Sequence, residues 1–358
     1  MQFKDYKYLI AYLGPLFCWG GLFLQSYASP GMFYLAFVII PLLELLLPQS
    51  DTKQSPHEDK RKGVLFFDVL LYLHLPIVYG LLIYYFHLLS LGGLSGFEHF
   101  GLLLNMGTLL GAMGINIAHE LGHRPGIFDK VTSQLLLLPA HYLHFQIEHN
   151  LGHHKFVATP EDPSTARRDE SLYAFWFRSV TGVYEKAWRI ESRVLERGNL
   201  PFWSWKNRMI RFTLLQLVYY LVILWFWGPF VLFMAIIAGI LGFLLLETVN
   251  YIEHYGLRRK KLKSGRYEPV NIHHSWNSNH PMGRIMLFEL TRHADHHFKA
   301  QRPYQILRHY EESPQLPMGY PAAMLLSLIP PLWFRAINTH LPSDDLGRGE
   351  TISAVGNA

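Results

Sequence analysis

Cysteine and charge are both scarce in this chain. Cys18 is the single cysteine among 358 residues, and it lies inside an apolar run. A lone thiol excludes a disulfide framework and an iron–sulfur cluster held by several cysteine thiolates. Charged residues make up only 16% of the chain, whereas an ordinary globular domain has roughly a quarter. Together with 50% hydrophobic and 15% aromatic residues, these shortages indicate an integral membrane protein.

Long apolar runs are abundant. A helix needs about 20 apolar residues to cross a bilayer, and six stretches approach or exceed that length. They cover residues 8–24, 32–47, 64–89, 97–118, 209–227 and 230–249. The mean hydropathy is only +0.11, so a sizeable polar region must accompany the spans. The expected fold is an all-α integral membrane protein with about six transmembrane helices, forming a single membrane-embedded domain over residues 1–358.

Lysine and arginine are distributed unevenly among the loops. Residues 25–30 and 90–96 contain neither, whereas the N-terminus, the loop after the second stretch and residues 124–208 are rich in both. Positively charged loops stay on the cytoplasmic side of a membrane. The N-terminus and the polar segments at about 119–208 and 250–340 are therefore expected to be cytoplasmic, with the two segments forming a helical cap.

Eight histidines fall into three tight groups at the ends of apolar stretches. They read HELGH (His119, His123), EHNLGHH (His149, His153, His154) and RHADHH (His293, His296, His297). Each group contains a pair spaced i, i+4, which shares one face of a helix. In the second group this pair is His149 and His153, and the neighbouring His154 points toward an adjoining face. A ninth candidate, His254, follows the sixth stretch.

The number of histidines indicates how many metal ions the chain could hold. Neutral imidazole is the commonest metal ligand, and a catalytic zinc ion takes only about three protein ligands. Eight clustered histidines therefore predict two metal ions in the cytoplasmic cap. Nitrogen ligands without thiolate favour iron, copper or zinc.

Two other functions also fit part of the pattern. HELGH matches H-E-x-x-H, the signature of zinc metalloproteases in which the glutamate is the general base. That interpretation leaves the other histidine groups unexplained, so a two-metal site that activates oxygen is favoured. A metal carrier is disfavoured, because transport sites lie near the bilayer midplane and these groups lie at one face.

Three carboxylates lie beside the histidines in the sequence: Glu120, Glu148 and Asp295. Metal-bound imidazoles usually donate their other ring N–H to a carboxylate or carbonyl. These three side chains are therefore expected to orient the imidazoles. They could instead cap helices or pair with arginines.

Longer stretches around the histidines resemble the membrane-bound alkane 1-monooxygenases (alkane ω-hydroxylases), which are relatives of the integral-membrane fatty-acid desaturases and hydroxylases. The resemblance rests on NIAHELGHR from Asn116, VATPEDPSTAR from Val157, NYIEHYGL from Asn250, HHSWNSNH from His273 and LTRHADHHF from Leu290. NYIEHYGL is the segment that separates alkane hydroxylases from desaturases. The resemblance extends over residues 116 to about 334, and Thr291 and Ala294 depart from the glutamine and serine usual in the third group.

The resemblance implies a metal centre and a reaction. It makes nine histidines the ligands of two iron ions: His119, His123, His149, His153, His154, His254, His293, His296 and His297. The implied reaction is hydroxylation of the terminal carbon of medium- or long-chain n-alkanes to 1-alkanols, with O₂ as co-substrate. A fatty-acyl desaturase or hydroxylase, or a monooxygenase of alkyl-aromatic methyl groups, is the alternative on the same scaffold.

The electrons for such a reaction must come from outside the chain, which carries no haem motif, flavin fingerprint or cluster. The resemblance implies a rubredoxin served by an NADH-dependent reductase, at the inner membrane of a bacterium. Small electron carriers are generally acidic, and a basic run offers a matching docking surface: Arg258, Arg259, Lys260 and Lys261. The same cations could instead anchor the chain against anionic lipid head groups. No nucleic-acid partner is expected.

Overall fold

The computed structural model describes residues 3–47, 49 and 58–342, and it contains no strand within these ranges. The elements of the first half are η1 (Phe3–Tyr12), α1 (Leu13–Leu24), α2 (Gly31–Tyr34), η3 (Leu35–Ile39), α3 (Ile40–Leu46), α4 (Leu65–Tyr72), α5 (His74–Leu91), α6 (Gly96–Leu109), η5 (Leu110–Ile115), α7 (Asn116–Gly122), α8 (Ile127–Leu137), α9 (Phe145–Glu148), η7 (His149–His153) and α10 (His154–Phe156). They are followed by α11 (Leu172–Arg197), α12 (Arg208–His254), α13 (Pro281–Met286), α14 (His293–Phe298), α15 (Tyr320–Ser327) and α16 (Pro330–Ile337).

Four helices of the described chain are long and apolar enough to cross a membrane. They are Phe3–Leu24, Leu65–Leu91, Gly96–Gly122 and Arg208–His254. The structure is therefore that of a multi-pass, all-helical membrane protein. The second predicted stretch corresponds to a shorter apolar helix, Gly31–Leu46. The fifth and sixth predicted stretches both lie within α12.

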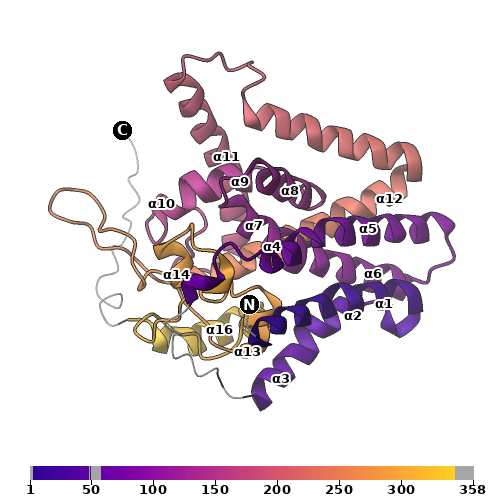
Figure 1. The fold of residues 1–358 in the computed structure, drawn as a ribbon, viewed down its shortest axis with the longest axis horizontal. Coiled ribbons are helices and arrows are strands. Elements are labelled where there is room, and N and C mark those ends of the chain that lie inside the picture. The colour runs from indigo at the N-terminus through magenta and orange to yellow at the C-terminus, as the bar shows by residue number, and fades with distance from the viewer. Residues whose placement is uncertain (1–2, 48, 50–57, 343–358) are drawn as a thin grey trace.

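The long helix α12 is broken near its middle. Gly228 has a φ of 82° and a ψ of 177°, which is not a helical conformation, and Pro229 follows it. This region of backbone space is essentially restricted to glycine, and proline lacks the N–H that would continue the helix. Figure 1 shows the result: the chain runs to the right along the first half of α12, turns, and returns along the second half toward the centre.

Small residues bring α12 close to the helix that carries the first histidine group. A Cβ at Gly107 would lie 2.6 Å from the Cβ of Leu241, and a Cβ at Gly111 would lie 2.9 Å from the carbonyl oxygen of Gly242. Glycines spaced by four residues form one flat strip on a helix, and such strips allow close helix packing in membranes. This contact places the C-terminal end of α12, with His254, near α7, with His119.

The segment after α12 carries the third histidine group on α14. Its helices α14 and α16 lie with α10 on the left in Figure 1, whereas α5, α6 and α12 extend to the right. Large aromatic side chains hold this segment to the end of α12. Tyr251, Trp276, Tyr320 and Trp333 are all fully buried there.

Candidate metal centre

The first histidine group lies at the end of a candidate span. His119 is in the last turn of α7, and His123 directly follows that helix. Their Nε2 atoms are 3.3 Å apart. The i, i+4 spacing therefore brings both imidazoles to one point, as the sequence predicts.

The second group departs from the expected pairing. His149 lies next to His154, with 3.0 Å between their Nε2 atoms, whereas His153 contacts His297 at 3.2 Å. The reason is local: residues 149–153 form a π-helix, η7. A π-helix has i→i+5 hydrogen bonds, and in this segment the rings of His149 and His153 stack with their centroids 5.2 Å apart, but their Nε2 atoms belong to different groups. The expectation that His149 and His153 serve one ion and His154 the other is therefore wrong.

The third group divides between the same two places. His293 and His297 are one helical turn apart on α14, with their Nε2 atoms separated by 2.9 Å. His296 points elsewhere, and its Nε2 lies 2.9 Å from that of His119. His254, the last residue of α12, has its Nε2 3.1 Å from that of His293.

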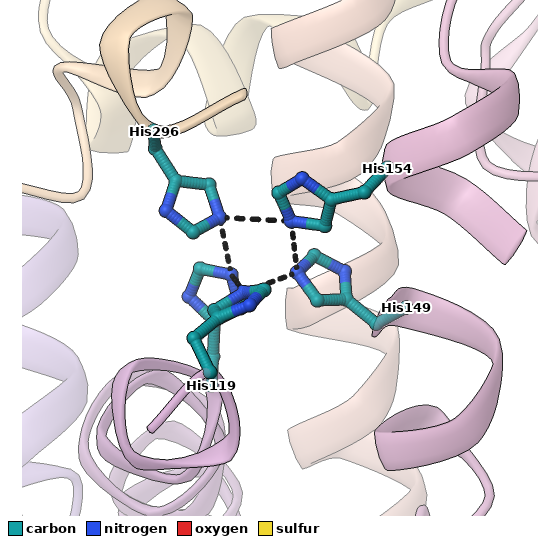
Figure 2. A group of neighbouring side chains, drawn as sticks. His119, His149, His154 and His296 are labelled. Atoms are coloured by element: carbon teal, nitrogen blue, oxygen red, sulfur yellow. Dashed lines mark hydrogen bonds between the residues drawn. The ribbon is translucent and has the colours of Figure 1, made fainter. Parts of the chain in front are cut away.

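Two groups result, each able to hold a metal ion. The five-histidine group consists of His119, His123, His149, His154 and His296, and the four-histidine group consists of His153, His254, His293 and His297. Within each group the nearest ring nitrogens all lie within 4.8 Å of one another. Figure 2 shows His119, His149, His154 and His296 converging from different elements on a common centre.

The separations between nitrogens match those around a metal ion. In the five-histidine group the neighbouring Nε2 atoms form a closed ring with contacts of 2.9 to 3.3 Å. Two nitrogens that each lie about 2.0–2.1 Å from one metal ion are about 3 Å apart when they subtend a right angle at it. The donor set therefore fits one ion per group.

The imidazoles are held in the form that binds metal. Burial lowers the pKa of His149, His154, His296 and His297 well below the usual value, and the neighbouring imidazoles lower it further. A neutral imidazole keeps a free nitrogen lone pair, which a protonated one lacks. These four imidazoles therefore offer a lone pair to a cation at neutral pH. His153 differs, because burial lowers its pKa but Asp162 outweighs burial and raises it.

Glu253 lies beside the four-histidine group and was not anticipated. Its Oε2 is 3.1 Å from the Nε2 of His293, and the side chain is almost completely buried. A carboxylate oxygen at this distance could complete the ligand set of this group. Glu253 directly precedes His254 in NYIEHYGL, so an acidic residue next to a candidate ligand was the available signal.

Asp162 was also missed, although it lies in the VATPEDPSTAR segment. Its Oδ2 is 2.9 Å from the Nδ1 of His153 and accepts a hydrogen bond from the hydroxyl of Thr165. Burial disfavours its charge, but His153 and Lys186 outweigh burial and hold the pKa of Asp162 below its usual value. Asp162 thus keeps a negative charge against Nδ1 and leaves the Nε2 of His153 free for a metal ion.

The three expected carboxylates lie near the histidines but have other partners. Glu120 accepts hydrogen bonds from Arg124 (3.1 Å) and from the backbone N–H of Tyr304 (3.3 Å). Glu148 pairs with Lys186 at 3.0 Å. Asp295 pairs with Arg302 and accepts hydrogen bonds from the backbone of Arg308 and the hydroxyl of Tyr310. Glu120 and Asp295 thus pair with arginines, which was the alternative that the sequence left open, and Glu148 pairs with a lysine.

The basic run lies in the loop that follows α12. Arg258, Lys260 and Lys261 are exposed. Arg259 is more constrained, because its guanidinium donates to the backbone carbonyls of Lys155 (2.9 Å) and Glu268 (2.7 Å). Arg259 therefore connects this loop to the segment that follows the second histidine group.

An apolar cavity reaches both histidine groups. The space in it that protein atoms leave free, open solvent included, is about 930 Å³. Its lining consists mainly of aliphatic and aromatic side chains from α2 to α3, η5, α12 and α13 to α15. His119 and His149 of the five-histidine group line it, together with His293 of the four-histidine group. An apolar molecule in this cavity would have one end beside both metal positions.

Comparison with known proteins identifies the family. A model of the fatty acid desaturase family matches residues 95–326, which include all nine histidines. Alkane 1-monooxygenase 1 of Alcanivorax borkumensis is 38% identical over 341 residues, which cover 93% of this chain and 84% of that protein. The alkane 1-monooxygenase of Pseudomonas putida has the same identity and coverage. The hydroxylase component of a xylene/toluene monooxygenase from Pseudomonas putida is 30% identical over 310 residues, covering 84% of this chain and 79% of that protein.

The fold and the site thus define a membrane protein with a histidine-rich centre suited to metal ions, of the fatty acid desaturase type. Within that group, the chain belongs to the alkane 1-monooxygenase family.

Proposed function

We propose that this chain is a di-iron monooxygenase that hydroxylates the terminal carbon of medium- or long-chain n-alkanes to 1-alkanols. The observation that carries the proposal is the apolar cavity whose lining includes histidines of both groups. In the overall reaction an alkane, O₂, two electrons and two protons give an alcohol and water. When bound, two iron ions would supply the activation of O₂ that a non-polar C–H bond requires.

The protein's own part begins with the substrate. An alkane has no group that can accept a hydrogen bond, so its recognition depends on burial, worth about 0.8 kcal/mol per CH₂. Met32, Phe37, Leu246 and Met286 are among the side chains that offer such a surface. A dry cavity also keeps water away from the reacting carbon. Because an alkane partitions into the bilayer, the bilayer supplies the alkane that enters the cavity.

Iron suits the ligands that these residues offer. Nine imidazoles and the carboxylate of Glu253 form a set of nitrogen and oxygen donors, and the single cysteine of the chain, Cys18, belongs to neither group. Such donors suit iron, and iron is used by oxygenases with histidine and carboxylate ligands. We infer that the nine histidines are the ligands. Asp162 would hold the imidazole of His153 in place through its Nδ1.

The electrons would come from an external carrier. We infer a rubredoxin-type donor, reduced by an NADH-dependent reductase, at the cytoplasmic face of a bacterial inner membrane. The basic run Arg258, Arg259, Lys260 and Lys261 is one proposed docking segment for an acidic carrier. Its support is charge complementarity.

Oxidation of alkyl-aromatic methyl groups is a second candidate reaction. The xylene/toluene monooxygenase component is similar along 84% of this chain. A zinc protease is disfavoured by the surroundings of Glu120, which pairs with Arg124 instead of lying free as a general base. A desaturase would release an alkene instead of an alcohol.

Metal analysis tests the centre. The purified protein should contain close to two iron ions per chain, and His153→Ala or His297→Ala should lower the iron content and abolish turnover. Each substitution removes one ligand of the four-histidine group. Stoichiometric zinc without iron, in protein produced with ample iron, would overturn the di-iron proposal.

Product analysis tests the reaction. Membranes that contain the protein, supplied with NADH, reductase and rubredoxin, should convert n-octane or a longer alkane to the 1-alcohol. Isotopically labelled oxygen from O₂ should appear in that alcohol. Label that arrives from water, or an alkene product, would contradict the proposal.

A further inference from the structure

A wide basin touches the five-histidine group at His123, which does not line the apolar cavity. It contains about 2420 Å³ of space free of protein atoms, and polar side chains dominate its lining. Lys62 lies just before α4, His123 just after α7 and Arg208 at the start of α12, and all three line the basin. The basin therefore lies where three candidate spans begin or end.

Positive charge predominates in the basin. Its lining contains six cationic side chains and three carboxylates: Lys62, Arg124, Lys130, Arg208, Arg211 and Arg302 against Asp68, Glu120 and Asp129. Arg124 alone lies within 4 Å of all three carboxylates, at 2.7, 3.1 and 3.7 Å. Arg208 pairs with Glu191 and Arg302 with Asp295, both of which lie outside the lining.

Three cations are left without a described acidic partner. Lys62, Lys130 and Arg211 are exposed and make no ion pair with any acidic side chain that the structure describes. They lie on three different elements, before α4, on α8 and on α12. Their charges therefore surround the basin instead of following one strip of sequence. Such an arrangement attracts an acidic partner into the basin.

The wall of the basin includes a member of the metal centre. His123 lines the basin, and its Nε2 is 3.0 Å from that of His149 in the five-histidine group. Leu151 also lines the basin and is 45% exposed, which adds an apolar contact between the surrounding cations. Weak electron-transfer complexes bury small interfaces, and a polar rim around an apolar centre is typical of protein interfaces.

We propose that this basin is the docking surface of the small acidic protein that delivers electrons to the centre, an inference that rests on the proposed function. A carrier bound in the basin would contact the imidazole edge of His123, one side chain away from a metal position. The alkane would approach the same group through different members, His119 and His149, which line the apolar cavity. The basic run at 258–261 has charge but contributes no histidine to either group.

Charge reversal in the basin tests the proposal. Lys130→Glu combined with Arg211→Glu should raise the apparent KM for reduced rubredoxin about tenfold or more at low ionic strength, because steering by charge is lost. The difference should fade at about 1 M salt, where charges are screened beyond roughly 3 Å. The affinity for oxidised rubredoxin, measured by titration without any turnover, should fall in parallel. Iron content should stay at the wild-type level.

The same change of charge in the basic run provides the matched comparison. Arg258→Glu combined with Lys261→Glu alters the net charge equally at two exposed positions, and it should change the rubredoxin KM much less. A larger effect from this pair than from the basin pair would overturn the proposal and assign docking to the basic run. Unchanged affinity in both variants would also overturn it.

Two further controls distinguish a failure of the docking proposal from unfolding of the variant and from a failure of the proposed function. If the basin pair unfolds the protein, the neutral variants Lys130→Gln and Arg211→Gln, checked by thermal melting, should still weaken rubredoxin binding. A wild-type protein that binds rubredoxin but forms no alcohol from any alkane would contradict the proposed function and leave the docking surface standing. If the wild-type protein forms alcohol and the neutral variants bind rubredoxin as tightly as it does, the proposed docking surface is contradicted and the proposed function is not.

Discussion

Asp162 reaches the metal centre through one contact with His153. Its two oxygens also accept hydrogen bonds from the backbone N–H of Ser164 and the hydroxyl of Thr165. Lys186 lies 3.9 Å away and also pairs with Glu148. The aspartate is therefore fixed from several sides, and the ring of His153 is fixed by it. A carboxylate that orients a ligand in this way usually matters for metal affinity.

Replacing Asp162 should weaken the centre without removing a ligand. Asp162→Ala should reduce iron affinity about 10- to 100-fold, and Asp162→Asn should reduce it less, because an amide oxygen can still accept from Nδ1. Competition with a chelator measures both. Glu185→Gln is the control, since Glu185 is an exposed partner of Arg189. Equal iron retention in Asp162→Ala and wild type would show that His153 does not depend on this contact.

At the scale of elements, the break in α12 decides how the last membrane-embedded segments are arranged. Gly228 occupies a conformation that other residues adopt only at a cost of about 1–3 kcal/mol. Apart from its chain neighbours and the backbone of its own helix, no heavy atom of the described residues lies within 4 Å of a Cβ placed at Gly228. The requirement for glycine is thus one of backbone conformation and not of space.

Gly228→Ala should therefore lower the thermal melting temperature, with a loss of about 1–3 kcal/mol in the free energy of unfolding. Gly80→Ala is the matched control, because Gly80 lies inside α5 with open space around its Cβ. Alanine favours a helix relative to glycine by about 1 kcal/mol, so this control should be neutral or stabilising. A Gly228→Ala protein as stable as wild type would mean that the break needs no glycine.

The π-helical segment η5 forms part of the wall of the apolar cavity. Ala112 lines the cavity seven residues before His119, which is about two helical turns. Filling this position should shorten the cavity while the metal ligands stay in place. Ala112→Phe should therefore shift the preference toward shorter alkanes, with iron content unchanged.

Competition between a short and a long alkane, followed by product analysis, measures this preference. Leu217→Phe is the control, because Leu217 is exposed on the outer face of α12. An unchanged ratio of products in Ala112→Phe would remove this part of the cavity from the substrate path.

At the scale of the whole molecule, the N-terminal helix is attached to the third histidine group through a buried charge cluster. Glu289 accepts hydrogen bonds from Lys7 (2.7 Å) and Tyr8 (2.9 Å) of η1. It also pairs with Arg284 (2.8 Å) and Arg292 (3.2 Å), which directly precedes His293. Burial alone would raise the pKa of Glu289, but Arg292, Lys7 and Arg284 outweigh burial and hold it below the usual value.

The depressed pKa gives a stability that depends on pH. A carboxylate with a lowered pKa in the folded state stabilises the fold above its unfolded pKa and loses that effect as the pH falls. Glu289→Gln should therefore lower the melting temperature most above pH 4.5, the ordinary value for glutamate, with a loss of about 3 kcal/mol or more. The difference from wild type should narrow below that pH. Glu311→Gln, at an exposed position, should melt like wild type throughout.

Much of this arrangement could be predicted from the sequence, because apolar runs and i, i+4 histidine pairs follow directly from helix geometry. All-helical architecture and the convergence of His119 with His123 are of this kind. The π-helix at 149–153 was not predictable, since it exchanges the roles of His153 and His154 without changing their spacing. Glu253 and Asp162 were missed because their contacts depend on the close approach of α12 and of the loop after α10, which tertiary packing sets.

The division of the nine histidines has a consequence for how metal enters the protein. The second segment supplies His149 and His154 to one group and His153 to the other, and α14 supplies His296 to one and His293 and His297 to the other. An ion bound by either group would thus order helices that the other group also uses, so the first binding event favours the second. Loading should be cooperative, and native mass spectrometry of a half-saturated sample should find mostly empty and fully loaded chains. A dominant population with one ion would show instead that the two positions fill independently.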